Sequence, residues 1–225
     1  MSDDRSVEWT SLRDVLVFHA LFVLVALAVL VLLPGGAGRQ LLALVLAYHI
    51  ALVTLAKAVD RPDWLALWSF LLPLSVFQVL PDYYLASAAG VLEFPNTGAP
   101  AIGPVPVFMA GLWVVPLFPI VYTAQWVCHR RGAFPALASA AMLSSVVFTV
   151  SEATLWQIPV WRAVGVAQTA HVAHYLLIPE LALGPMAWLA FRHSRSHGLI
   201  QRLGAAAAVM LAYLGSAILF LAWLG

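Results

Sequence analysis

Residues 70–106 read FLLPLSVFQVLPDYYLASAAGVLEFPNTGAPAIGPVP, and this stretch decides how the rest of the chain is interpreted. It begins as an apolar helix, carries Gln78 and Asp82 along one side, and ends in a loop rich in Pro, Gly and Asn. A carboxylate on an apolar helix is costly in lipid, so we expect Asp82 to face a protein interior or a wet cavity. The stretch therefore predicts a polar pocket inside a bundle of membrane helices.

The composition is typical of a membrane protein. Of the 225 residues, 63% are hydrophobic and 9% are charged, whereas soluble domains have about 45–50% and about 25%. The mean hydropathy of +0.94 agrees. The single cysteine, Cys128, excludes an internal disulfide and a Cys-based metal site. We expect a lipid bilayer around the chain and no nucleic-acid partner, and the oligomeric state stays open.

Seven apolar runs are each long enough to cross a bilayer, which takes roughly 20 residues for about 30 Å of hydrocarbon. They cover residues 14–33, 40–59, 64–90, 105–128, 134–155, 163–191 and 203–224. No small-residue cleavage site follows the first run, so we interpret Val15–Leu33 as a retained membrane helix and not as a cleaved signal peptide. The sequence predicts an all-α polytopic bundle of seven transmembrane helices, forming one domain over residues 1–225.

The basic residues predict an orientation for this bundle. One side would hold Arg5, Arg13, Lys57, Arg61, Arg130, Arg131, Arg192, Arg195 and Arg202, and the other side would hold Arg39 and Arg162. Because cytoplasmic loops carry an excess of Lys and Arg, this nine-to-two division favours a cytoplasmic N-terminus and an external C-terminus. We expect a multi-pass protein of the bacterial inner membrane.

Polar residues follow one face in three of the predicted helices. The three sets are Ser75, Gln78 and Asp82; Ser145, Thr149 and Glu152; and Gln168, His171, His174 and Tyr175. Such spacings put side chains on a shared helix face, and lipid offers these groups no hydrogen-bond partner. In the predicted orientation all three sets lie in the outer half of the membrane. Ser and Thr are also typical of contacts between membrane helices, so the carboxylates are the stronger indication of a functional site.

Several of these polar residues have alternative interpretations. Glu180 is half a turn out of phase with His171, and Pro179 is expected to kink the helix and turn Glu180 back toward the pocket. Glu152 could instead pair with Arg162 across a short loop. Two further histidines, His19 and His49, have no acidic neighbour in the sequence and are expected to be hydrogen-bonded core residues.

The predicted site gathers acids, histidines and aromatic residues in the outer half of the bundle, beneath an outer loop, 93–104, expected to act as a lid. The catalytic candidates are Asp82, Glu93, Glu152, His171, His174 and Glu180. The candidates for substrate binding are Gln78, Tyr83, Tyr84, Asn96, Trp113, Thr149, Trp156, Trp161, Gln168 and Tyr175. The aromatic members are also typical of the belt that membrane proteins carry at the lipid–water interface.

These residue types indicate acid–base chemistry on a hydrophobic small molecule. A buried carboxylic acid can donate a proton, and a His or a second carboxylate can accept one, without any cofactor. Phosphate loops, HExxH motifs and nucleophile elbows are absent from the sequence. The only Lys, Lys57, lies on the second predicted helix, which excludes a retinal Schiff base on the seventh. Two alternatives stay open: a metal-dependent lipid hydroxylase or hydrolase using His171, His174 and Glu152, and a small proton-coupled carrier or ligand-binding protein.

Two segments carry a resemblance to known proteins. LEFPNTGAPAIGPVPVFMAGLWVVPL (92–117) and VSEATLW (150–156) with HVAHYLLIPELALG (171–184) resemble an uncharacterised bacterial family of small polytopic membrane proteins. More distantly, they resemble carotenoid hydratases, heterodimer-type lycopene cyclases and integral-membrane meroterpenoid cyclases. Ile178-Pro179-Glu180 is similar to the Pro-x-Glu-Glu element of the lycopene cyclases, although one Glu is present and directly follows the Pro. The resemblance implies cyclisation, hydration or isomerisation of an isoprenoid, with Glu180 as a catalytic acid.

Overall fold

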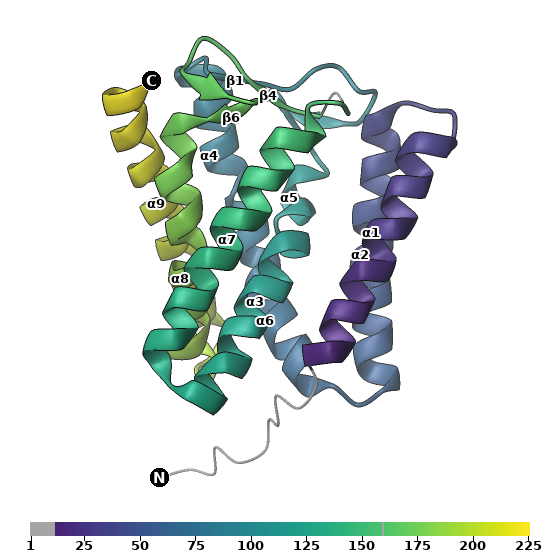
Figure 1. The fold of residues 1–225 in the computed structure, drawn as a ribbon. Helices are drawn as coiled ribbons and strands as arrows, with labels where there is room; N and C mark the ends of the chain where they lie inside the picture. Colours follow the sequence, from purple (N-terminus) through teal and green to yellow (C-terminus); the bar gives the residue numbers. More distant parts are fainter. Residues whose placement is uncertain (1–11, 159) are drawn as a thin grey trace.

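Seven long helical segments run alongside one another in the computed structural model, which describes residues 12–158 and 160–225 (Figure 1). The helices are α1 (Leu12–Leu32), α2 (Ala37–Ala58), α3 (Pro62–Phe77), α4 (Val79–Tyr83), the π-helical turn η1 (Tyr84–Ala88), α5 (Met109–Leu112), α6 (Val114–Arg131), α7 (Ala133–Leu155), the 3-10 turn η2 (His174–Leu176), α8 (Leu177–Ser194) and α9 (Leu199–Leu224). The strands are β1 (Leu92–Glu93), β2 (Ala101–Ile102), β3 (Val105–Pro106), β4 (Arg162–Ala163), β5 (Gln168–Thr169) and β6 (Val172–Ala173).

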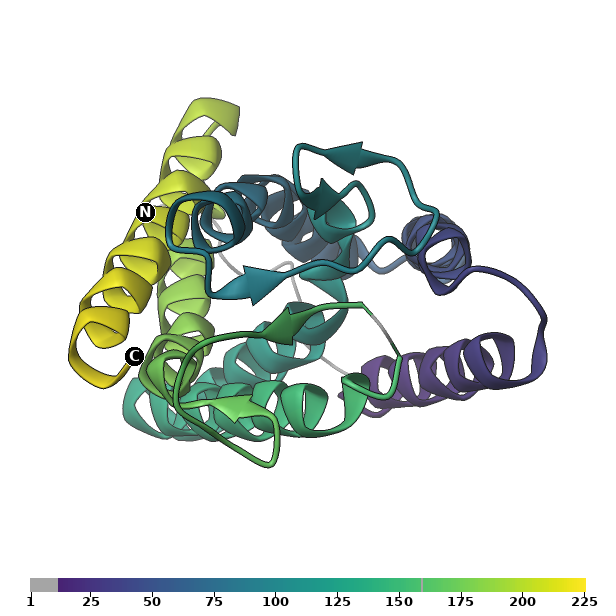
Figure 2. The same ribbon diagram turned by 90° about the horizontal axis from the view of Figure 1, so that it is seen from above.

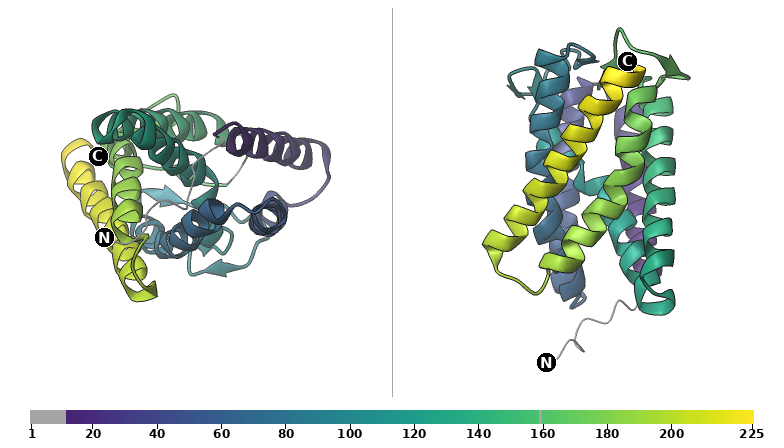
Figure 3. Two further views of the ribbon diagram at one scale, coloured as in Figure 1. Left: turned by 90° about the horizontal axis from the view of Figure 1, so that it is seen from below. Right: turned by 90° about the vertical axis from the view of Figure 1, so that its left-hand side faces the viewer.

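The two ends of the bundle differ. All six of these strands lie at one end, which we call the strand end, and they cross over the ends of the helices (Figure 2). At the opposite end, which we call the turn end, short turns join α2 to α3, α6 to α7 and α8 to α9. Helices α1 and α2 stand at one side of the bundle, and α8 and α9 stand at the other (Figure 3).

Six of the described helical segments are long and apolar enough to cross a membrane. They are Leu12–Leu32, Ala37–Ala58, Pro62–Ala88, Met109–Arg131, Ala133–Leu155 and Leu199–Leu224. The all-α class is therefore confirmed, and the segments indicate a multi-pass membrane protein. The seventh long helix, α8, packs against α7 and α9.

The predicted sixth span, 163–191, is wrong over its first half. Residues 162–176 form β4, the β5–β6 hairpin and η2, and the long helix begins only at Leu177. Ala170 and His171 form the turn of the hairpin with φ angles of 50° and 68°, which a right-handed helix does not allow. The segment is apolar because Val172, Ala173 and Leu176 are buried against the end of the bundle. The high hydropathy of residues 163–176 therefore reflects burial against protein and does not indicate a membrane span.

The other predicted spans agree with the structure to within a few residues, apart from two local differences. The third span is one path built of α3, α4 and η1, with Pro73 inside α3. The fourth begins at Met109 and not at residue 105, because Val105 and Pro106 pair with β2.

The basic residues separate between the two ends of the bundle. Arg13, Lys57, Arg61, Arg130, Arg131, Arg192, Arg195 and Arg202 belong to helix ends and turns at the turn end. Arg39 lies in the first turn of α2 at the strand end, and Arg162 lies in β4. Arg5, which contributed to the predicted division, lies outside the described residues.

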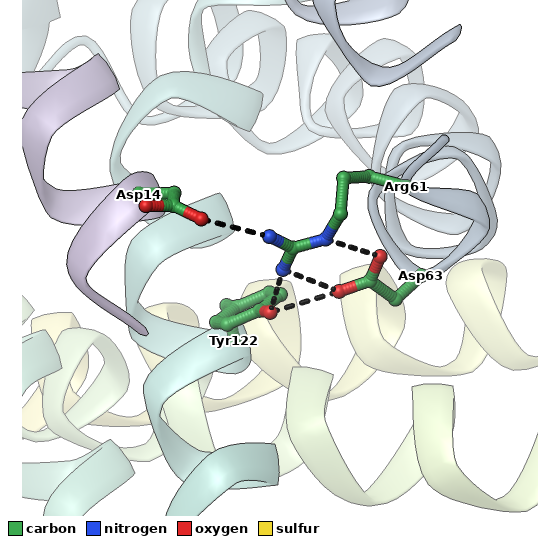
Figure 4. Close-up of polar contacts among 4 residues, drawn as sticks. All are labelled: Asp14, Arg61, Asp63 and Tyr122. Atoms are coloured by element: carbon green, nitrogen blue, oxygen red, sulfur yellow. Dashed lines mark hydrogen bonds and ion pairs between the residues drawn. The ribbon is translucent and has the colours of Figure 1, made fainter. Parts of the chain in front are cut away.

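A buried polar cluster at the turn end connects three helical segments (Figure 4). Arg61 donates to both carboxylate oxygens of Asp63, at 3.1 and 3.0 Å, and to Asp14 of α1 at 3.1 Å. The Tyr122 hydroxyl of α6 accepts from Arg61 at 2.6 Å and donates to Asp63 at 2.8 Å. The hydrogen bonds to Asp63 raise the pKa of Arg61 above its usual value, against the opposite effect of burial. The cluster therefore attaches α1 to the α2–α3 turn.

Candidate functional site

A cavity of about 610 Å³ lies in the half of the bundle nearer the strand end. Its walls come chiefly from α1, α2, α6 and α7, and almost all of the lining is apolar. Leu92 and Phe94, in and beside β1, bound it at the strand end together with residues in and before β4: Ile158, Val160, Trp161 and Ala163. These two segments are held together by the antiparallel pairing of Leu92 with Ala163 and of Glu93 with Arg162. The volume lies within the range of small-molecule sites, about 300–1,000 Å³.

Three carboxyl groups from three different helices reach this cavity. Asp82 of α4 and Glu180 of α8 are each only 4% exposed, and Glu152 of α7 is half-buried. Asp82 accepts a hydrogen bond from the Trp113 indole at 3.4 Å, and Glu152 accepts one from the Ala173 backbone at 3.0 Å. The predicted convergence of the acids of the third, fifth and sixth helices is therefore seen in the structure.

Glu180 is held in place by an unusual contact between α7 and α8. The Ser144 hydroxyl donates to the Glu180 carbonyl at 2.6 Å and accepts from the Gly184 N–H at 3.1 Å. It thus stands between the two backbone groups that would otherwise bond directly within the helix. The close approach requires glycine at position 184, since a Cβ there would lie 2.6 Å from the Ala140 carbonyl oxygen. The first turn of α8, with Glu180, is fixed against α7.

Two tyrosines lie beside the carboxyl groups. Tyr213 of α9 lines the cavity, and its ring meets that of Trp113 edge to face, with ring centroids 5.8 Å apart. Tyr175 is fully buried in η2. Burial first, and then the negative charges of Glu152, Glu180 and Asp82, raise the pKa of the Tyr175 phenol above its usual value. The three acids therefore belong to one electrostatic cluster.

The cavity has an open side between α1 and α7. Val23 and Leu27 of α1 and Val146 and Val150 of α7 line it, yet each is about half exposed on the outside of the bundle. Both helices are candidate membrane spans, so this apolar rim is suited to contact with lipid.

The structure does not bring the two predicted histidines to the cavity. His171 is exposed in the β5–β6 turn and stacks on Trp156, with ring centroids 4.2 Å apart. His174 begins η2 and is hydrogen-bonded to the Thr169 hydroxyl at 2.8 Å. Within residues 12–158 and 160–225, no three His, Cys, Asp or Glu side chains are grouped so that they could hold a metal ion. The predicted helical face of Gln168, His171, His174 and Tyr175 is therefore wrong, and the metal-dependent alternative lacks its ligand set.

Other predicted residues lie around the cavity and not in its wall. Glu93 is exposed and pairs with Arg162 at 2.8 Å, so Arg162 pairs with this residue and not with Glu152. Asn96 accepts from the Gly98 N–H in an exposed turn. Tyr83, Tyr84, Thr149, Trp156 and Gln168 are likewise not among the lining residues, whereas Trp113 and Trp161 are.

The polar face of α3 continues away from the cavity. Gln78 lies one turn before Asp82, is fully buried, and has no hydrogen-bond partner for either amide atom among the described residues. Ser75, a further turn away, is also fully buried. The predicted face of Ser75, Gln78 and Asp82 therefore points into the bundle.

Three residues of the site were not predicted from the sequence. Tyr213 lies on α9, a largely apolar helix without an acid or a histidine, so no functional role was expected there. Ser144 could not be distinguished from its neighbour Ser145 in the sequence, and only the structure shows that Ser144 contacts the backbone of α8. His19 was expected to be a hydrogen-bonded core residue, which its bonds to Val15 (2.7 Å) and Tyr48 (2.9 Å) confirm, but it also lines the cavity.

Comparison with known families matches residues 79–224 to a domain of unknown function (DUF6989). No curated protein and no solved structure matches the chain. The matched region spans α4 to α9 and so contains all three carboxyl groups of the cavity. The expectation of an uncharacterised family is confirmed, and no match links the chain to carotenoid or terpene cyclases.

Proposed function

The chain belongs to the DUF6989 family. We propose that this member is an integral-membrane enzyme acting on an apolar, isoprenoid substrate by acid–base chemistry. One observation carries the proposal: a cavity with apolar walls, open toward lipid, receives Asp82, Glu152 and Glu180 together. Apolar walls favour a hydrocarbon substrate, and carboxyl groups in such surroundings are suited to proton transfer. The isoprenoid class rests on the sequence resemblance of residues 92–117 and 150–184.

Hydrogen bonding divides the roles among the carboxyl groups. Glu180 Oε2 has no hydrogen-bond partner among the described residues, so Glu180 is the proposed proton donor. Glu152 accepts a backbone N–H and Asp82 accepts the Trp113 indole N–H. Hydrogen bonds of this kind favour the charged carboxylate, so these two residues are the proposed proton acceptors.

The proposed reaction conserves protons and electrons. Glu180 gives its proton to one carbon of an alkene, the π electrons form the new C–H bond, and the adjacent carbon becomes cationic. Loss of a proton from a neighbouring carbon to Glu152 gives isomerisation. Prior attack by a second alkene gives cyclisation, and addition of water followed by loss of its proton gives hydration. Trp113 and Tyr213 line the same cavity, and their rings would stabilise the passing positive charge.

The proposal includes a membrane orientation. Eight basic residues at the turn end and two at the strand end support a cytoplasmic turn end. Helix α8 would then complete seven spans, with the C-terminus outside. In a bacterial inner membrane the cavity would open into the outer leaflet.

Replacement of one carboxyl group tests the function. Membranes containing the wild type, Glu152→Gln or Asp60→Asn are incubated with isoprenoid extracts, and products are compared by mass spectrometry. Asp60→Asn removes an equivalent charge at an exposed turn with positive φ, where Asn is well tolerated. We expect a product from the wild type and from Asp60→Asn, and about a hundredfold less from Glu152→Gln. Normal product formation by a folded Glu152→Gln protein would contradict the assignment.

A further inference from the structure

The charges in the cavity wall are all of one sign. Asp82, Glu152 and Glu180 line it, and the described lining contains no Lys or Arg. The basic side chain that does line it, His19, has both ring nitrogens engaged by Val15 and Tyr48. An ionised carboxylate in apolar surroundings needs a partner of opposite charge, and the chain supplies none at the wall. The wall therefore repels an anionic headgroup and is complementary to a cation.

One carboxyl oxygen is free for such a partner. Glu180 is 4% exposed, lies at the cavity, and its Oε2 atom has no hydrogen-bond partner among the residues that the structure describes. The backbone of the same residue is fixed by Ser144. The carboxyl group at the cavity thus has an unused hydrogen-bonding capacity, and hydrogen bonds between charged groups are the strong ones.

Aromatic rings line the same cavity. Trp113 packs against Phe148 at 5.5 Å and against Tyr213 at 5.8 Å between ring centroids, and all three residues line the cavity. Ring faces attract an ammonium group, most strongly when water is excluded. The remaining wall is aliphatic and suits an apolar chain.

From these features we infer that the cavity binds lipophilic amines, with the ammonium group on Glu180 and the apolar chain directed toward the opening between α1 and α7. The inference rests on the proposed function in that it uses the same cavity and carboxyl groups. An amine that enters uncharged takes the Glu180 proton on its nitrogen lone pair, which gives an ammonium–carboxylate pair. Such an amine competes with a neutral substrate for the cavity. A carboxylic acid with the same apolar chain does not bind.

Three probes with one chain and different headgroups test this selectivity. Farnesylamine, farnesol and farnesoic acid are titrated by calorimetry into the full chain in phosphatidylcholine nanodiscs, and the heats of empty nanodiscs are subtracted. We expect the amine to bind about tenfold more tightly than the alcohol, and the acid to give no heat above the blank. Glu180→Gln should reduce the affinity for the amine to that for the alcohol. Asp60→Asn should leave both affinities unchanged.

The outcomes separate this inference from the proposed function. Equal binding of amine and alcohol, or tighter binding of the acid, overturns the headgroup selectivity and leaves an apolar substrate cavity in place. Absence of binding by all three probes overturns both. If Glu180→Gln does not fold, Val150→Trp tests whether the amine binds in the cavity. Val150 lies on the half-exposed rim of the cavity, so this substitution is expected to fold. It should weaken amine binding, and unchanged binding would place the amine elsewhere and overturn the inference.

Discussion

At the scale of single residues, the site depends on how Glu180 is held. Its carboxyl group lies at the cavity, while its carbonyl accepts from the Ser144 hydroxyl of α7. Pro179 precedes it, so the backbone around Glu180 is restrained both by the ring and by the neighbouring helix. A side chain held in this way is preorganised for proton transfer and needs little rearrangement.

The glycine beneath this contact gives a test of the packing. Gly184→Ala adds a Cβ 2.6 Å from a backbone oxygen of α7, and we expect it to lower the free energy of unfolding by about 1–3 kcal/mol. Gly215→Ala is the matched control, since nothing lies within 4 Å of its added Cβ. It should be neutral or stabilising by up to about 1 kcal/mol. Unfolding in sodium dodecyl sulfate measures both, and equal effects would contradict the close contact.

The sequence was informative about the acids and less so about their neighbours. Asp82 and Glu152 stood out because a carboxylate in an apolar helix is costly, and both reach the cavity. Glu180 was expected to reach the pocket through a kink at Pro179, and this reason is wrong: α8 begins at Leu177, so Pro179 lies in its first turn and no kink is needed. Tyr213 escaped prediction because tyrosine is also common in belts and cores, so only its position in three dimensions distinguishes it.

At the scale of elements, α1 is attached mainly at one end. Its buried residues are Val15 and His19, both in its first two turns, and Asp14 joins the Arg61 cluster there. Beyond His19 the helix buries no residue and instead forms a wall of the cavity. Helix α1 is thus fixed at the turn end and forms one side of the opening farther along.

The Arg61 cluster predicts unequal effects for its two aspartates. Asp63 is 2% exposed and holds Arg61 through two hydrogen bonds, so Asp63→Asn should cost about 1–3 kcal/mol by removing the buried one of the two carboxylates that pair with Arg61. Asp14 is 50% exposed, so Asp14→Asn should cost less than about 1 kcal/mol. Chemical unfolding of the two purified variants measures the difference, and a larger effect of Asp14→Asn would contradict the described cluster.

Hydropathy predicted the long helices of the bundle well and failed for the apolar segment that covers its end. The runs that became α1, α2, α7 and α9 are apolar because their outer faces are exposed, and their bounds were close to the prediction. Residues 163–176 are apolar for another reason, since they cover the end of the bundle. Their hairpin turn at Ala170 and His171 carries no Gly or Pro that would have identified it.

At the scale of the whole molecule, the cavity opens to the side and is closed at the strand end. Substrate would therefore enter from the membrane, between α1 and α7, and not from water. At the strand end the cavity is bounded by the paired strands β1 and β4, and not by the apolar rim of α1 and α7.

A bulky residue at the rim tests this route. Val150 is 55% exposed and lines the cavity, so Val150→Trp should fold normally and lower the rate with a membrane-dissolved substrate. Val25→Trp is its control, because Val25 is equally exposed on α1 but does not line the cavity. Initial rates at several substrate concentrations in the bilayer measure the effect. Equal rates for the two variants would contradict entry between α1 and α7.

Incorporation of solvent deuterium tests the central claim, proton transfer from a carboxyl group to carbon, most directly. Membranes are incubated in D₂O with an isoprenoid mixture, and the products are examined by mass spectrometry. Our account predicts carbon-bound deuterium in the product of the wild type and none with Glu180→Gln. A product that forms without solvent deuterium, or deuterium uptake that survives Glu180→Gln, would contradict it.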